Sequence, residues 1–343
     1  MSLRVAVVGA TGAVGTVMLR KLRERDFPAR EIVPFASERS AGRELEGGLV
    51  VQALSEESIQ GFDIAIFSAG ATTSRAWAPR FAAAGCVVVD NSSAFRRDPE
   101  IPLVVSEVNP EALDAHKGII ANPNCSTMQL MVALKPIHAA VGIERLIVST
   151  YQSVSGTGVA AVEELESQTH ALLHGMEPPA PQIYRETIAF NVHGGAGNFV
   201  DGDDHTDEER KMMFETRKIL EAPDIGISVT CARVPVISAH SESVNVQTRD
   251  DITPDAVREL LRAAPGIELV DDPESNGYPT ALGAAGRDEV FVGRIRRDPS
   301  HPRAINLWVV SDNLLKGAAT NAIQIAEALH ERGLVRVPAR QAA

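Results

Sequence analysis

Residues 3–15 read LRVAVVGATGAVG, a short apolar strand followed by a turn that contains three glycines. A helix is predicted next, over Thr16 to Arg25. This order is typical of a dinucleotide-binding fold: Gly9 turns the chain, Gly12 admits a pyrophosphate, and Gly15 lets helix and strand pack closely. The segment predicts a parallel α/β domain that binds a nucleotide.

The residues after the second predicted strand indicate which nucleotide is bound. That strand runs from Glu31 to Ala36 and ends in Ser37-Glu38-Arg39-Ser40. An NAD site usually has an acidic side chain here, to hold the ribose 2′-OH. Two hydroxyl groups and a guanidinium instead suit a 2′-phosphate, which needs hydrogen-bond donors and positive charge. The pattern predicts NADP, whereas an inward-facing Glu38 would admit NAD.

Small residues at the ends of other predicted strands indicate further ligand contacts. The strand Asp63 to Phe67 closes in Ser68-Ala69-Gly70, and the strand Arg145 to Thr150 leads into a Ser/Gly turn that opens a helix. Ligands of open parallel sheets bind where the strands end. The predicted cofactor contacts are Gly9, Thr11, Gly12, Ala13, Val14, Ser37, Arg39, Ser40, Ser68, Gly70, Ser155 and Gly156.

One cysteine, Cys125, lies in the tight turn Asn122-Pro123-Asn124-Cys125-Ser126-Thr127. The residues after it have the spacing of a buried helix face that runs to about Pro136. Cys125 is therefore expected near a helix N-terminus, where free N–H groups and the helix dipole favour a thiolate and can hold an oxyanion. Free cysteines are more often buried and inert, but this position favours a nucleophile.

The other two cysteines, Cys86 and Cys231, lie in apolar runs and are predicted to be strand interiors. Three cysteines are too few for a disulfide framework, and no sequence of the secretory kind is present at the N-terminus. These features predict a cytoplasmic, reduced protein.

Composition limits the classes of partner. The 343 residues, 44% of them hydrophobic, are enough for two domains with ordinary cores. The formal net charge of -12 argues against a nucleic acid or an anionic membrane. No apolar run reaches the roughly 18 residues of a membrane span. Any anionic ligand must then be held by a few local cations.

Several motifs occur in the order found in bacterial aspartate-semialdehyde dehydrogenases, which the chain resembles over nearly its whole length. They are Gly9 to Gly15, Asn122 to Thr127, Gln152 to Gly156, Arg233 to Glu242 and Asp312 to Gly317. The resemblance implies an α/β Rossmann-type domain, residues 1–125 completed by 313–343. It also implies an α+β catalytic and dimerisation domain, residues 126–312, resembling that of glyceraldehyde-3-phosphate dehydrogenase.

The same resemblance implies an activity. Members of this family reversibly convert L-aspartate 4-semialdehyde, phosphate and NADP to L-4-aspartyl phosphate and NADPH, a step toward lysine, methionine and threonine. Cys125 would be the nucleophile that forms a thiohemiacetal and then a thioester, and His240 the acid/base. His240 is expected at the end of an alternating strand. A homodimer or a dimer of dimers, built on one face of a mixed sheet, is implied as well.

Further site residues follow from the resemblance. Arg233 would hold the substrate α-carboxylate, Gln152 would orient the substrate, and Glu208 would contact its amine. Arg96 and Lys211 would bind phosphate, with Arg97 as the alternative to Arg96, and Asn313 would lie near the nicotinamide. Independently, Thr206-Asp207-Glu208-Glu209 predicts a capping box that places Glu208 and Lys211 on one helix face.

Residues 191–204, which read NVHGGAGNFVDGDD, depart from the family pattern, in which Ile-Pro and an acidic residue are usual. The spacing of His193, His205 and the aspartates fits no metal motif, so no metal is predicted. A mobile loop over the active site is the prediction for this segment.

Two rival functions remain open on sequence. An N-acetyl-gamma-glutamyl-phosphate reductase would share the fold and the thiol chemistry but act on a longer substrate. A non-catalytic, nucleotide-binding paralogue is the alternative of another class. The residues around Arg233, His240, Glu208 and Lys211 favour the aspartyl enzyme over the first, and the presence of both Cys125 and His240 argues against the second.

Overall fold

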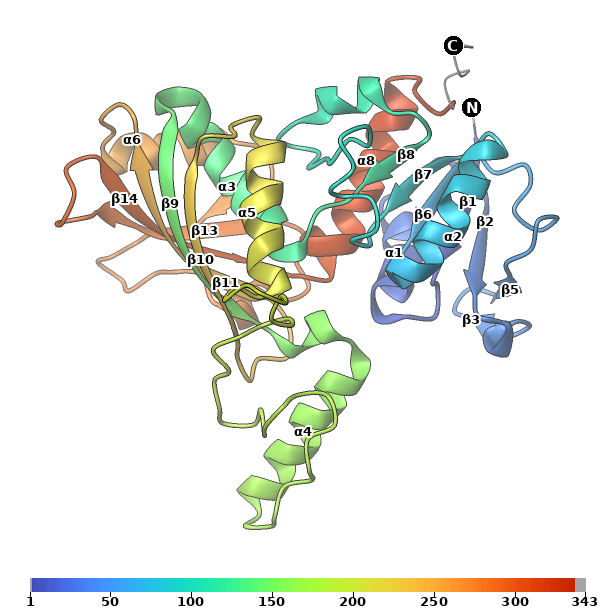
Figure 1. Ribbon diagram of the computed structural model, residues 1–343, viewed down its shortest axis with the longest axis horizontal. Coiled ribbons are helices and arrows are strands. Elements are labelled where there is room, and N and C mark those ends of the chain that lie inside the picture. The colour runs from blue at the N-terminus through green and yellow to red at the C-terminus, as the bar shows by residue number, and fades with distance from the viewer. Residues whose placement is uncertain (1, 337–343) are drawn as a thin grey trace. The chain divides into compact units, whose positions relative to one another are not determined.

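The computed structural model describes residues 2–336 and divides into two compact units, which are considered separately (Figure 1). Within this range, unit 1 comprises residues 2–124 and 318–336, and unit 2 comprises Cys125–Gly317. The chain leaves unit 1 one residue earlier than the predicted boundary and re-enters it five residues later. Asn313 belongs to unit 2 because its side chain hydrogen-bonds Ser153 and Ser155 there.

Unit 1 contains a six-stranded sheet in the order β5-β2-β1-β6-β7-β8, and all its neighbouring strands are parallel. A small antiparallel pair, β3 and β4, stands beside it. The elements are β1 (Leu3–Val8), α1 (Ala13–Glu24), β2 (Ala29–Ala36), η1 (Glu38–Ser40), β3 (Glu44–Leu45), β4 (Leu49–Val50), β5 (Gln52–Ala53), β6 (Ile64–Phe67), α2 (Gly70–Ala83), β7 (Val87–Asp90), η2 (Pro110–Ala115), β8 (Ile119–Ala121) and α8 (Thr320–Glu331).

Both faces of this sheet are covered, which explains its continuous apolar strands. Alternate residues of β1 enter two separate cores. Val5 and Val7 pack with α1 and α8 on one face, while Ala6 and Val8 pack with α2 and Phe35 on the other. Helices on both faces of a parallel sheet define a doubly wound nucleotide-binding fold.

Unit 2 contains a mixed six-stranded sheet in the order β10-β9-β11-β14-β13-β12. The two outer pairs are parallel and the inner pairs antiparallel. Its elements are α3 (Cys125–Val141), β9 (Ile143–Gln152), η3 (Val154–Thr157), α4 (Val159–Leu173), α5 (Asp207–Ile219), β10 (Gly226–Arg233), β11 (His240–Thr248), α6 (Pro254–Ala263), β12 (Ile267–Leu269), α7 (Ala281–Ala284), β13 (Val290–Arg297) and β14 (Ala304–Ser311). A π-turn, η4 (Leu315–Ala319), follows β14.

Helix α3 lies on one face of this sheet, where it contacts β9, β11, β13 and β14 as well as α5 and α6. The residues of β9 that face this layer are buried, whereas Ile147 and Tyr151 on the opposite face are exposed. Helix α4 projects away from the sheet and packs its own small core against Ile188 and Ala189 (Figure 1). The sheet thus has one covered and one open face.

Three details of the sequence prediction are wrong. Helix α3 continues through Pro136 to Val141, because buried side chains on both sides of the proline hold it against the sheet. Cys86 is buried but directly precedes β7, since its N–H donates to Phe81 O at the end of α2. His240 begins a strand and does not end one, because the chain turns between Arg233 at the end of β10 and His240.

None of the helices within residues 2–336 combines the length and apolar character of a membrane span.

Candidate active site

Cys125 is the first residue of α3, as its sequence context predicted. Its Sγ lies 3.3 Å from Nε2 of His240, the first residue of β11. Gly317 packs on the cysteine so closely that a Cβ there would lie 2.9 Å from Cys125 Cβ. The start of α3, the start of β11 and Gly317 together fix the position of the Cys125 thiol.

His240 is fully buried, and Ser153 contacts its second ring nitrogen. The backbone N–H of Ser153 donates to Nδ1 at 3.1 Å, and the Ser153 hydroxyl lies at the same distance. Because an N–H group can only donate, Nδ1 accepts, and neutral His240 carries its proton on Nε2, facing Cys125. Burial, followed by the charge of Arg233, lowers the pKa of His240 well below 6.5, so the ring is neutral near pH 7.

The residue before the histidine has an unusual backbone conformation. Ala239 has φ 71, in the left-handed region that residues other than glycine rarely adopt. Its N–H donates to Asn313 Oδ1 at 3.0 Å. Strain of this kind persists where surrounding contacts enforce it, often beside functional groups, and here it sets the direction in which His240 enters β11.

The candidate substrate residues lie in one row across the sheet. Arg233 of β10 pairs with Gln152 of β9, and His240 of β11 pairs with Ser311 of β14. Strand β9 lies between β10 and β11. Arg233, Gln152 and His240 therefore lie on three adjacent strands at one end of the sheet, with their side chains in the buried layer.

The Arg233 side chain is buried but only partly hydrogen-bonded. One terminal nitrogen, Nη1, donates to Ser153 O at 2.7 Å, whereas Nε has no partner among the described residues. Gly156 packs against this arginine and against His240: a Cβ at residue 156 would lie 3.4 Å from Arg233 Nη1 and 3.3 Å from the imidazole. The guanidinium therefore keeps a donor available for an anion.

Gln152 and Glu208 meet in the same buried layer. Gln152 Nε2 donates to Ser126 Oγ at 2.7 Å and to Glu208 Oε1 at 3.3 Å. Thr206 and Glu209 form the predicted capping box at the start of α5. Lys211 Nζ donates to Glu208 Oε2 at 3.2 Å and to Asp207 at 2.6 Å, and these carboxylates raise the pKa of Lys211 despite its burial. Helix α5 thus brings Glu208 to Gln152.

Asn313 connects the turns around the histidine. Its Oδ1 accepts hydrogen bonds from Ser153 Oγ at 2.9 Å and Ser155 Oγ at 3.2 Å, and its Nδ2 donates to Ser155 Oγ at 3.0 Å. The Asn313 side chain also accepts a hydrogen bond from the Ala239 N–H. It therefore links the segment after β14 to η3 and to the residues that precede β11.

Unit 1 has a cavity of about 580 Å³ at the glycine turn. The predicted cofactor residues that line it are Gly9, Thr11, Gly12, Ser37 and Ser68, and Glu38 lines it too. The other five predicted cofactor residues of unit 1 are not part of its lining: Ala13 and Val14 begin α1, Gly70 begins α2, and Arg39 and Ser40 belong to η1. Ser155, Gly156 and Asn313 belong to unit 2. Gly15 admits no side chain, because a Cβ would lie 2.1 Å from Gly9 O. The turn and cavity suit a dinucleotide.

Arg96 and Arg97 differ in burial. Arg96 is buried and donates from Nη2 to Asn91 O at 3.1 Å, whereas Arg97 is exposed. The neighbouring Asp90 is fully buried, and that burial raises the pKa of its carboxyl although Ser74, Ser92 and Arg96 lower it. Arg96 is therefore the arginine held in a defined position.

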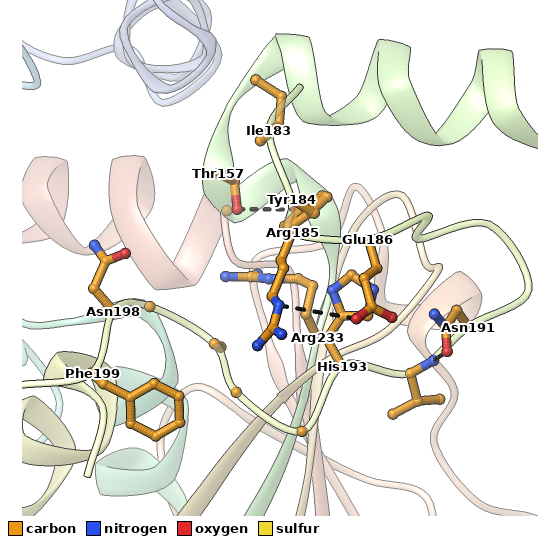
Figure 2. Close-up of a pocket in the computed structure, with 16 residues that line it drawn as sticks. Thr157, Ile183, Tyr184, Arg185, Glu186, Asn191, His193, Asn198, Phe199 and Arg233 are labelled. Atoms are coloured by element: carbon orange, nitrogen blue, oxygen red, sulfur yellow. Dashed lines mark hydrogen bonds and ion pairs between the residues drawn. The ribbon is translucent and has the colours of Figure 1, made fainter. Parts of the chain in front are cut away.

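Residues 191–199 of the glycine-rich segment form one wall of a cavity of about 840 Å³ in unit 2 (Figure 2). His193 pairs with Arg233 through two backbone hydrogen bonds of 2.9 Å. Arg185, Glu186 and Arg233 also line this cavity (Figure 2). Because Gly156 and Arg233 also line it, the cavity borders the residues that pack against His240.

The histidines of this region are engaged separately: His193 Nε2 lies 3.2 Å from Thr187 O, and His205 Nδ1 lies 2.7 Å from Asp203. Within residues 2–336, no three His, Cys, Asp or Glu side chains gather as a metal site would require.

Sequence reasoning missed Ser153 and Ala239 as supports of His240, and Gly317 as the contact of Cys125. Ser153 and Gly317 lie inside motifs, but their partners are distant in sequence. The turn Ser238-Ala239-His240 offers no glycine or asparagine that would have indicated positive φ.

Comparison with known proteins identifies the class. Residues 4–116 match the semialdehyde dehydrogenase NAD-binding domain, and residues 134–316 match the semialdehyde dehydrogenase dimerisation domain. The chain is thus built as a semialdehyde dehydrogenase, and the predicted fold class is confirmed.

Similar individual proteins specify the family within the semialdehyde dehydrogenases. The chain is 52% identical to the aspartate-semialdehyde dehydrogenase of Aquifex aeolicus, over 98% of this chain and 100% of that one, and 49% identical to that of Bacillus subtilis, over 97% and 99%. Aspartate semialdehyde dehydrogenase II of Vibrio cholerae, crystallised with ASA, has a TM-score of 0.92 and 49% identity, covering 96% of this chain and 99% of that one. The Candida albicans enzyme, crystallised with NADP, has a TM-score of 0.74 at 26% identity, covering 97% and 100%. The chain belongs to the aspartate-semialdehyde dehydrogenase family.

Proposed function

We propose that this chain catalyses the reversible, phosphate-dependent oxidation of L-aspartate 4-semialdehyde to L-4-aspartyl phosphate, with NADP as the oxidant. The observation that carries the proposal is the 3.3 Å contact between Cys125 Sγ and His240 Nε2 at the end of a row that also contains Arg233 and Gln152. The family supports the substrate, since the relatives are named for it. The reaction belongs to amino-acid biosynthesis.

Cys125 would act as the nucleophile. The N-terminus of α3 and the Nε2–H of His240 both favour a thiolate. The thiolate adds to the aldehyde carbon, a C–S bond forms, and the carbonyl oxygen becomes the oxygen of a thiohemiacetal. His240 first donates a hydrogen bond to that oxygen and serves as acid/base for its proton.

A bound dinucleotide supplies the hydride acceptor. As the thiohemiacetal is oxidised it becomes a Cys125 thioester, which phosphate attacks. The C–S bond then breaks, the thiolate leaves, and the acyl phosphate is released. Covalent catalysis divides a difficult oxidation and phosphorylation into two easier steps.

Substrate binding is assigned to the buried layer around the cysteine. Arg233 would bind the α-carboxylate, and its Nε, which has no partner among the described residues, supports this role. Gln152 would orient the substrate, and Glu208 would accept from its amine. Arg96 and Lys211 would bind phosphate, which must compete with Asp207 and Glu208 for Lys211.

NADP is proposed over NAD because Ser37, Arg39 and Ser40 supply donors and positive charge after β2. Gly9, Thr11, Gly12, Ala13 and Val14 would approach the pyrophosphate, with Ser68, Gly70, Ser155, Gly156 and Asn313 as further contacts. Glu38 lines the cavity of unit 1 and is the residue that opposes this preference. Kinetics with both cofactors tests it: a kcat/KM for NAD at or above that for NADP would overturn the assignment.

A homodimer is proposed through the open face of the unit 2 sheet. Ile147, Tyr151 and Tyr278 are exposed there by 38%, 39% and 50%, and such an apolar surface on a dimerisation domain suits a second copy. A dimer of dimers is the larger alternative. A cytoplasmic location stays a prediction from sequence.

The decisive experiment measures NADPH formation from aspartate semialdehyde, with and without phosphate or arsenate, for the wild type and Cys125→Ala. Phosphate-dependent turnover that Cys125→Ala abolishes is expected. Activity only with N-acetyl-glutamate semialdehyde would support the reductase alternative, and dinucleotide binding without turnover would support the paralogue. Full activity of Cys125→Ala would defeat the covalent mechanism.

A further inference from the structure

A second row of buried side chains, which includes Thr150 and Glu242, lies beneath the row that contains His240. In the sheet register, Cys231 of β10 pairs with Thr150 of β9, Thr150 pairs with Glu242 of β11, and Glu242 pairs with Val309 of β14. Each lies two residues from a member of the first row and shares its face, because side chains alternate along a strand. All four are buried.

Among the side chains of this row, that of Glu242 is the least favourable to bury in a protein core. It is fully buried, and neither carboxyl oxygen accepts a hydrogen bond of good geometry from the described residues. Gln129 of α3 is its polar neighbour, and the Gln129 amide lowers the pKa of this carboxyl. Neither Gln129 Nε2 nor Thr150 Oγ1 makes a hydrogen bond of good geometry among the described residues. Buried polar atoms without partners are costly, and their presence calls for an explanation other than stability.

The positions of these residues give that explanation. Gln129 lies one helical turn after Cys125, and Glu242 lies two residues after His240 on the same face of β11. The Gln129–Glu242 contact therefore lies directly behind the Cys125–His240 contact, between the same helix and the same strand. We propose that Glu242 is a positioning residue that acts through Gln129 to hold the first turn of α3, and thus Cys125 Sγ, at His240 Nε2.

The chemistry of the surroundings requires Glu242 to be a neutral acid. Burial raises the pKa of its carboxyl well above 4.5, and the Gln129 amide is the neighbour that lowers it. The titratable and charged groups of this layer are the thiols of Cys125 and Cys231, the imidazole of His240, the guanidinium of Arg233 and the carboxylates of Glu208 and Glu209. Burial, and then the nearby carboxylates, raise the pKa of Cys231. A negative charge on Glu242 would disfavour a thiolate at Cys125, whereas a neutral acid keeps the polar contact without that effect.

The proposal rests on the proposed role of Cys125, but its test does not require turnover. Iodoacetamide alkylation of Cys125 is followed against pH in the full-length protein, alongside kcat, KM and thermal unfolding. Glu242→Gln keeps shape and polarity and is expected to match the wild type within about twofold in kcat, with the same apparent thiol pKa. Glu242→Leu is expected to unfold at the wild-type temperature or above, yet to lose about tenfold to a hundredfold in kcat and to show a raised thiol pKa.

Matched variants keep the proposal falsifiable. Thr150→Val removes a buried hydroxyl from the same row and is expected to leave activity unchanged. Gln129→Leu is expected to show the same loss of activity as Glu242→Leu. If Glu242→Leu does not fold, Gln129→Leu takes its place in the test. A wild-type alkylation profile in both leucine variants would overturn the positioning role. A lower thiol pKa in Glu242→Gln would overturn it as well, since the native carboxyl would then be charged. If the wild type is inactive with aspartate semialdehyde but the variants change the Cys125 alkylation profile as expected, only the proposed substrate is wrong.

Discussion

The backbone N–H of Ser153 donates to Nδ1 of His240 at 3.1 Å, and the Ser153 Oγ lies at the same distance from that nitrogen. The same residue accepts a hydrogen bond from Arg233 through its carbonyl. One residue of the β9–η3 connection therefore fixes the tautomer of the histidine and the direction of the arginine. The Nε2–H then faces Cys125, so His240 starts as a hydrogen-bond donor and can act as a base only after that proton has moved.

This tautomer predicts different outcomes for two substitutions of His240. In His240→Gln the side-chain amide can still donate to the thiolate, so Cys125 alkylation is expected to stay within about tenfold of the wild type. NADPH formation is expected to fall by about 10²-fold or more, because an amide cannot exchange the proton of the thiohemiacetal. His240→Ala should lose both activities. Wild-type turnover in His240→Gln would show that no proton transfer is needed at this position.

The three cysteines are predicted to differ sharply in reactivity. Burial raises the pKa values of the Cys231 and Cys86 thiols well above 9, while Cys125 begins a helix beside an Nε2–H. Brief treatment with iodoacetamide near pH 7.5, followed by peptide mass mapping, should label Cys125 and spare the other two. Cys125→Ser should take up no label under these conditions. Equal labelling of Cys231 would contradict the burial argument.

Gly156→Ala is predicted to damage activity more than stability. The new methyl group would lie 3.3 Å from the His240 ring and 3.4 Å from Arg233 Nη1, so one of them must move by a few tenths of an ångström. A loss of about tenfold to a hundredfold in kcat/KM is expected, with little change in melting temperature. Gly194→Ala is the control, because nothing lies within 4 Å of a Cβ there. Equal losses in both variants would indicate a general effect on the cavity.

The protonated state of Glu242 predicts how stability depends on pH. The folded protein keeps this proton above pH 4.5, where the unfolded chain releases it. The folded state thus binds more protons, so its free energy of unfolding falls as pH rises from about 4.5 toward the raised pKa, with a limiting slope of about 1.4 kcal/mol per pH unit. Glu242→Gln removes this titrating group. In denaturant unfolding, the free energy of unfolding of this variant should therefore rise relative to that of the wild type between pH 5 and 8.

The control for this measurement is Glu166→Gln on α4, where the carboxyl is exposed. It should follow the wild-type pH dependence throughout. A constant difference in unfolding free energy between wild type and Glu242→Gln from pH 5 to 8 would mean that the carboxyl does not hold its proton.

Local sequence was enough for much of the fold and of the site. The glycine turn after β1, the capping box of α5 and the cysteine at the start of α3 depend on residues close together in the chain, whose backbone requirements are visible in their side chains. The same holds for the apolar strands of unit 1, because a parallel sheet covered on both faces needs continuous apolar runs.

The tertiary structure alone decided how the reactive groups are oriented. The tautomer of His240 depends on Ser153, 87 positions away along the chain, and the row of Arg233, Gln152 and His240 depends on strand register. The burial of Glu242 beneath that row could not be predicted from sequence either, since a glutamate in an alternating strand carries no sign of which face it occupies. Side-chain chemistry is local, whereas burial, register and hydrogen-bond partners are set by packing between segments distant in sequence.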